Sequence, residues 1–60
     1  MDEHAANTLL RLAALANIRA DIYHMDGVIY IAFHATRSLY NNYDECLQAI
    51  ILTVELDAVK

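Results

Sequence analysis

The sequence predicts an α+β fold in the order helix, β-hairpin, helix (αββα), as a single domain over residues 1–60. Three observations support this order. An alanine- and leucine-rich first segment has helical spacing, two strand-like runs flank an Asp-Gly pair, and helical spacing returns in the last third. With 60 residues, 58% of them hydrophobic, and one cysteine, the chain has room for one small core and no disulfide within it.

The first predicted helix covers residues 3–16. Its apolar residues stand at positions 5, 6, 9, 12, 13 and 16, which is the spacing of one helix face. Asp2 is the expected N-cap, and Glu3 suits the positive end of the helix dipole. Asn17 is expected to end the helix, because asparagine tolerates the left-handed conformation found just past many helix C-termini.

The predicted hairpin has strands at 18–25 and 28–35, joined by Asp26-Gly27, a pair that favours the type I′ turn. A turn of two residues fixes the pairing of every residue in both strands. In that register one face collects most of the aliphatic residues, whereas the charged Arg19 and Asp21 share the other face. This separation supports the hairpin.

An all-α helical hairpin, again as a dimer, is the alternative fold. Positions 16, 20, 23, 27, 30 and 34 also lie on one helical stripe, and Gly27 inside a helix costs only about 1 kcal/mol relative to alanine. We prefer the β-hairpin because the register set by its turn separates aliphatic from charged residues with no further choice.

The last predicted helix covers residues 38–58. Thr36 or Ser38 is a candidate N-cap, and Asn42 with Glu45 forms an internal capping box if the helix begins later. One apolar stripe runs along this helix and is expected to face its own sheet: Leu39, Tyr43, Cys46, Leu47, Ile50, Val54 and Ala58.

A second stripe, on nearly the opposite side of the last helix, consists of Ala49, Leu52, Leu56 and Val59. A helix that is apolar on two sides is covered on two sides. Because the hydrophobic fraction exceeds what one small core hides, we expect a homodimer or a higher oligomer, with this stripe against its counterpart in the second chain. Two hairpins paired edge to edge would form a four-stranded antiparallel sheet.

An apolar and aromatic patch is expected near the turn, on the other face of the hairpin: Tyr23, Met25, Val28 and Tyr30. Cross-strand aromatic pairs stabilise hairpins, which is one sufficient explanation for the two tyrosines. Tyrosine is also enriched at protein interfaces. On that second interpretation the chain is a small non-enzymatic module that binds a larger protein and regulates or inhibits it.

We expect neither a catalytic site nor a metal or cofactor. The sequence has no paired ligand spacing of the kind typical of zinc, and the hairpin register directs His24 and His34 to opposite faces. Cys46 lies on the first stripe of the last helix and is expected in the core as a small hydrophobe. The competing hypothesis is a reactive thiol near a helix N-terminus.

The formal charge is −4, and the permanent cations Arg11, Arg19, Arg37 and Lys60 are scattered along the chain. A phosphate-binding protein needs a clustered basic surface, so the charge argues against nucleic acid as a partner. Two alternative functions stay open. One is a small dimeric regulator that is associated with nucleic acid and uses the arginines of two chains; the other is an acidic inhibitor that mimics nucleic acid.

The longest uninterrupted apolar run, Val28–Phe33, is far shorter than the ~18 residues of a membrane-spanning helix. The first residues, Met1 to His4, are acidic where a signal peptide is basic. We therefore expect a cytoplasmic protein with no membrane partner.

Overall fold

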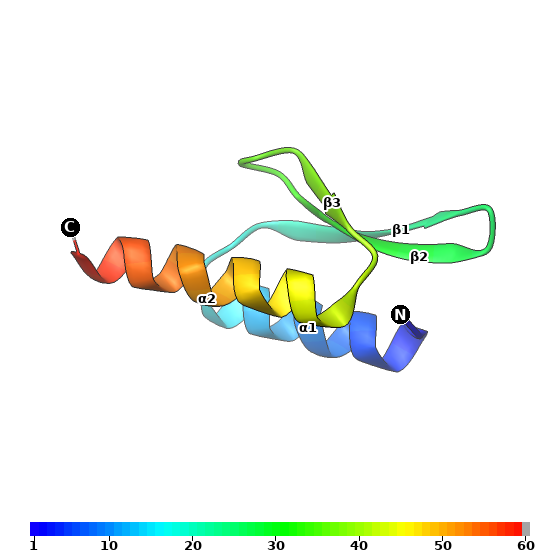
Figure 1. The fold of residues 1–60 in the computed structure, drawn as a ribbon, viewed down its shortest axis with the longest axis horizontal. Coiled ribbons are helices and arrows are strands. Elements are labelled where there is room, and N and C mark those ends of the chain that lie inside the picture. The colour runs from blue at the N-terminus through cyan, green and yellow to red at the C-terminus, as the bar shows by residue number, and fades with distance from the viewer. Residues whose placement is uncertain (60) are drawn as a thin grey trace.

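Both helices lie on one side of a three-stranded antiparallel sheet in the computed structural model, which describes residues 1–59 (Figure 1). The predicted α+β class is confirmed, and the all-α alternative is wrong. The sheet has the strand order β1-β2-β3. The elements in chain order are α1 (Glu3–Leu15), β1 (Ala20–Met25), β2 (Val28–Phe33), β3 (Ser38–Tyr40) and α2 (Tyr43–Val59).

Helix α1 begins at Glu3, as predicted, and ends at Leu15, one residue before the predicted end. The Asp2 side chain accepts a hydrogen bond of 2.7 Å from the backbone N–H of Ala5, which satisfies one of the free donors of the first turn. Asn17 has φ 60°, and Ile18 N donates to Ala13 O at 2.8 Å. Together with the bond from Asn17 N to Ala14 O, this is a Schellman motif, which turns the chain from the helix towards β1.

The hairpin formed by β1 and β2 has the predicted register. Asp26 and Gly27 both have positive φ, 52° and 75°, as a type I′ turn requires. Met25 lies opposite Val28, and Tyr23 lies opposite Tyr30. The face that holds the aliphatic residues is turned towards the helices, because Ile31 and Phe33 are buried there.

A third strand is the main departure from the predicted fold. Residues 38–40, which we assigned to the start of the last helix, instead form β3, with Leu39 opposite Ala32. The loop between β2 and β3 passes through Arg37 at φ 55°, a conformation that glycine or asparagine adopts more easily. With neither residue present, the sequence carries no ordinary turn signal at this point.

Helix α2 therefore begins late, at the internal cap. The Asn42 side chain accepts from Glu45 N at 3.1 Å, and the Asn42 carbonyl accepts from Cys46 N at 3.1 Å. Asp44 and Glu45 occupy the first turn, at the positive end of the helix dipole. Tyr43, the first helical residue, packs against the core.

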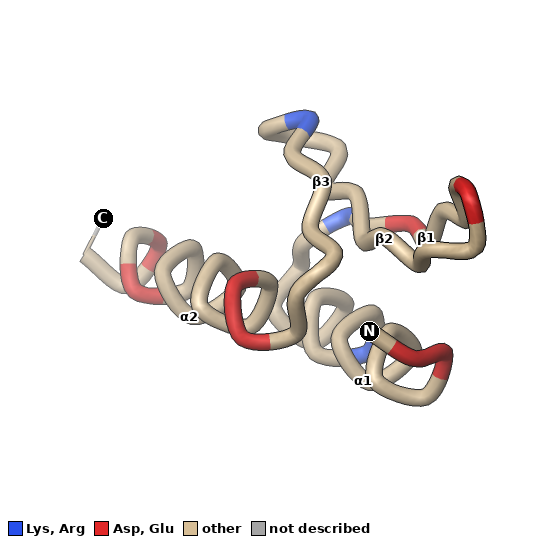
Figure 2. Tube along the Cα trace, turned by 45° about the vertical axis from the view of Figure 1, so that its right-hand side comes forward, with Lys and Arg blue, Asp and Glu red and all other residues tan. Residues whose placement is uncertain are grey.

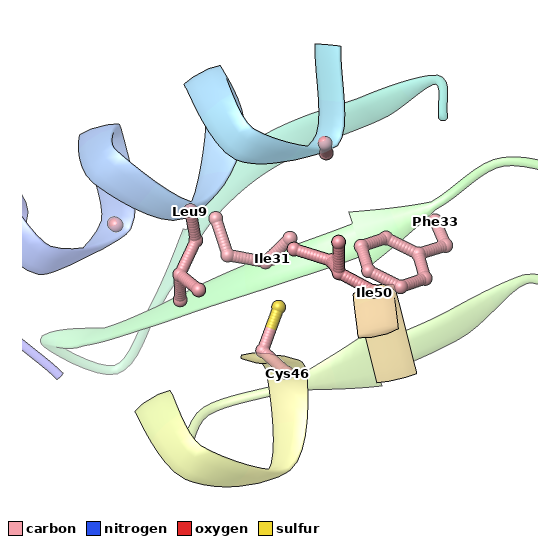
Figure 3. Packing of buried hydrophobic residues seen from close by; sticks show 7 residues of the cluster. Leu9, Ile31, Phe33, Cys46 and Ile50 are labelled. Atoms are coloured by element: carbon pink, nitrogen blue, oxygen red, sulfur yellow. The ribbon is translucent and has the colours of Figure 1, made fainter. Parts of the chain in front are cut away.

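The core lies between the two helices and the inner face of the sheet (Figure 3). The Cys46 side chain points from α2 towards Ile31 of β2, and Leu9 of α1 lies beside Ile31 (Figure 3). Phe33 and Tyr40 close the β3 edge of this core, with ring centroids 5.2 Å apart and a tilted geometry. The buried set consists of Ala6, Leu9, Ala13, Ile31, Phe33, Cys46 and Ile50.

Candidate interaction surfaces

The outer face of the sheet carries the predicted aromatic patch. Tyr23 and Met25 are exposed to 50% and 46%, Val28 to 36%, and Tyr30 is partly buried. All four side chains lie on the side of the hairpin opposite the helices, since their neighbours in sequence pack against the core. An apolar surface of this kind on a small protein is typical of a contact with another molecule.

This patch continues into an open groove of about 480 Å³. Leu39, exposed to 52%, extends the apolar surface onto β3, because it lies opposite Ala32. His34 and Arg37, from the loop that follows β2, form the polar part of the lining. Sequence reasoning missed Leu39 and Arg37 here, since both were assigned outside the sheet. The residues that line the groove are Tyr23, Met25, Ala32, Phe33, His34, Arg37 and Leu39.

An ion pair joins two side chains of the outer face. His34 Nε2 contacts Asp21 Oδ2, and the two side chains are 51% and 55% exposed. Arg19 and His34 share a face with Asp21 in the predicted register, so the sequence did contain the signal for this contact. His24 lies on the inner face, as predicted, and the two histidines are not brought together.

The predicted contact stripe of α2 faces solvent over most of its length. Leu52, Leu56 and Val59 are exposed to 57%, 61% and 85%, whereas Ala49 is partly buried. Every described residue from Ile51 onward is exposed, and this end of α2 projects past the sheet (Figure 1). The spacing 49, 52, 56, 59 is the 3-4-3 spacing of a seam between two helices.

Cys46 is a core residue, as predicted. Its side chain has no exposed surface, and burial raises its pKa to about 11. The neutral thiol therefore dominates at physiological pH, and the thiolate needed for nucleophilic attack is suppressed. Among residues 1–59, no three His, Cys, Asp or Glu side chains gather in a way that would hold a metal ion.

The arginines lie on three separate parts of the fold: α1 (Arg11), the residue before β1 (Arg19) and the loop between β2 and β3 (Arg37) (Figure 2). Acidic residues occupy both ends of α2. The N-terminus of α2 is thus already supplied with negative charge, which opposes the phosphate binding that free helix N-termini favour.

Neither helix, within the described part of the chain, combines the length and the apolar character needed to cross a membrane. Comparison of the chain with models of known families, with curated proteins and with solved structures finds no match.

Proposed function

We propose that this protein is a small, non-enzymatic interaction module that associates with itself and binds a larger protein, which it regulates or inhibits. The observation that carries the proposal is the apolar surface left open by the fold. Leu52, Leu56 and Val59 of α2 together with Tyr23 and Met25 of β1 are all exposed in the single chain. So much uncovered hydrophobic surface on 60 residues is the signature of a protein that functions in a complex.

Self-association uses the α2 stripe formed by Ala49, Leu52, Leu56 and Val59. Leu52, Leu56 and Val59 are exposed and free to face a second helix, whereas Ala49 packs against the core at the start of the stripe. Burying an exposed leucine stabilises a complex by about 1.5–3 kcal/mol before the entropy of association is subtracted. Several such residues on each chain give the contact its driving force.

The larger partner is held on the outer face of the sheet, at Tyr23, Met25, Val28 and Tyr30. Tyrosine provides a large apolar ring and a hydroxyl group with little loss of side-chain entropy, and methionine adapts to different shapes. This surface lies on the opposite side of the sheet from both helices, so a partner can bind here while the α2 stripes are paired.

Sedimentation equilibrium at low micromolar concentration tests the first half of the proposal. Wild-type protein is expected to sediment as more than one copy, and Leu52→Glu/Leu56→Glu to lose that contact. Val54→Glu is the matched control, because Val54 is also exposed, at 46%, but lies on a different side of α2. A wild-type mass of one chain, or an equal effect of Val54→Glu, contradicts the proposal.

Photocrosslinking in extracts of the native host tests the second half. A benzophenone residue at position 23 is expected to trap one protein reproducibly, whereas the same residue at exposed position 7 of α1 does not. The trapped protein, once purified, should bind wild type and lose affinity for Tyr23→Ser/Met25→Ser by at least tenfold. Equal binding of both forms would remove the outer patch as its site.

A further inference from the structure

Strand β1 leaves a row of backbone hydrogen-bonding groups unused by its own sheet. It is an edge strand, since the strand order is β1-β2-β3. In an antiparallel ladder alternate residues direct their N–H and C=O groups to the neighbouring strand. Met25 and Val28 form the hydrogen-bonded pair that closes the two-residue turn, and Arg19 O accepts from His34 N at 3.0 Å. The odd-numbered residues of β1 therefore direct their backbone groups towards β2. The residues whose backbone groups point away from β2 are therefore Ala20, Ile22 and His24.

The opposite edge of the sheet, formed by β3, has fewer outward-facing backbone hydrogen-bonding groups. Strand β3 has three residues, and only Leu39 directs its backbone groups outward, because its neighbours on each side pair with β2. β1 has six residues and contains neither proline nor lysine, two residues that commonly protect a sheet edge; its one acidic residue, Asp21, lies on the outer face. The edge of β1 is thus the longer of the two edges.

We propose that β1 pairs antiparallel with β1 of a second copy, with Ile22 opposite the partner's Ile22. This register is the one in which all three outward-facing residues are used, because Ala20 then lies opposite the partner's His24 on both sides of the two-fold axis. Each of the three pairs exchanges two hydrogen bonds, about six in all. A shift of two residues in either direction loses one of these pairs.

The side chains agree with this register. Asp21 lies opposite the partner's Tyr23, and Arg19 opposite the partner's Met25, so no like charges meet along the seam. In the register shifted towards the N-terminus, Asp21 would instead face the partner's Asp21, which is repulsive. Charge thus selects against one of the two competing registers, and the number of hydrogen bonds selects against both.

Pairing through β1 joins two three-stranded sheets into one sheet of six strands. The exposed Tyr23 side chains of both copies then lie diagonally next to one another on the outer face, on either side of the two-fold axis, and each Met25 lies further from the axis. The surface proposed for the larger partner becomes a single patch built from two chains, and it is incomplete in one. This inference rests on the proposed self-association, but on a contact whose residues are separate from the α2 stripe.

With both contacts in use, each chain has two different two-fold interfaces, and closure gives four copies. Chemical synthesis of the chain with N-methyl-Ile22 tests the β1 contact alone. The methyl group removes the outward N–H and blocks the edge while the side chain and the β1–β2 ladder stay intact. N-methyl-Leu39 is the matched control, since it removes the outward N–H of the other edge.

The mass by sedimentation equilibrium is expected to be four copies for wild type, two for N-methyl-Ile22, two for Leu52→Glu/Leu56→Glu and one for the combination. N-methyl-Leu39 should match wild type, and circular dichroism should show the same fold throughout. An unchanged mass with N-methyl-Ile22 overturns the β1 contact and leaves the α2 contact standing. Wild type could instead have the mass of two copies. If N-methyl-Ile22 then dissociates this dimer and Leu52→Glu/Leu56→Glu does not, the β1 contact is supported and the α2 contact is overturned.

The register has its own test in a Cys46→Ala background. Ile22→Cys is expected to form a disulfide between two chains under mild oxidation, because residues facing each other as a hydrogen-bonded pair have Cα atoms about 5.5 Å apart. His24→Cys should not, since the two copies of residue 24 are four residues out of register, about 13 Å apart. Crosslinking of His24→Cys but not Ile22→Cys would overturn the register.

Discussion

Asp21 and His34 contact each other across the outer face of the β1–β2 hairpin, Oδ2 of the carboxylate against Nε2 of the imidazole. They are diagonal neighbours, because Asp21 lies opposite Ala32, and His34 follows Ala32 by two residues on the same face. The pair sits beside the groove rather than inside the core. His34 of this pair lines the groove together with Arg37.

This ion pair should contribute little to stability. In a double-mutant cycle with Asp21→Asn and His34→Ala, we expect a coupling free energy below about 1 kcal/mol in urea denaturation, because both side chains are half exposed and water screens their attraction. A cycle between Asp21 and the distant His4 is the control and should give zero. A coupling of 2 kcal/mol or more would show that the pair is a structural element of the hairpin.

The hairpin could be predicted because one local feature determined many distant contacts. The Asp26-Gly27 turn fixes the register. The register in turn determines which face is buried and makes Asp21 and His34 neighbours on the other face. β3 could not be predicted in the same way. Its three residues are too few for a period to be visible, and Leu39 happened to continue the apolar stripe of the last helix.

Because β3 was not predicted, part of the groove on the outer face was not predicted either. Because Arg37 reaches its left-handed conformation without glycine or asparagine, the turn that brings it to the groove has no local signature. The α2 stripe and the Tyr23 patch were visible in the sequence, since periodicity alone places their residues on one face. What periodicity cannot show is which edge of the sheet remains open, because that depends on the third strand.

Asn17 should prove important for the end of α1. Asn17→Ala is expected to lower the free energy of unfolding by about 1 kcal/mol, because alanine adopts φ 60° at a cost that asparagine largely avoids. Asn17→Gly is the matched substitution and should leave stability equal to wild type or slightly higher, since glycine is the most favourable residue at this position. Chemical denaturation measures both. Equal losses in the two variants would mean that the Asn17 side chain, rather than its backbone conformation, stabilises the fold.

Asn42 should determine where α2 starts. Asn42→Ala removes the acceptor for Glu45 N, and we expect a loss of about 1 kcal/mol in the free energy of unfolding. Asn42→Asp retains a side-chain acceptor at the N-cap and should keep most of the stability. Amide hydrogen exchange gives a direct local measurement: the N–H of Glu45 should exchange faster in Asn42→Ala than in Asn42→Asp. If it exchanges equally fast in both, the cap is not formed in solution.

Cys46 should make the stability of the fold sensitive to alkaline pH. Its pKa is raised from 9.0 to about 11 by burial, so the folded protein keeps a proton that the unfolded chain has lost between those two values. The contribution to stability is therefore complete below pH 9 and falls as pH rises towards 11, by on the order of 2 kcal/mol. The Cys46→Ala variant is the control, because it keeps every tyrosine that also titrates in this range. The difference in free energy of unfolding between wild type and Cys46→Ala should be constant from pH 6 to 8 and shift against wild type above pH 9.

Labelling of wild type with iodoacetamide at pH 8 should be correspondingly slow, limited by opening of the core between α1, α2 and β2. Rapid labelling at pH 8 without loss of structure would place the thiol at the surface and contradict the packing of Cys46 against Leu9 and Ile31.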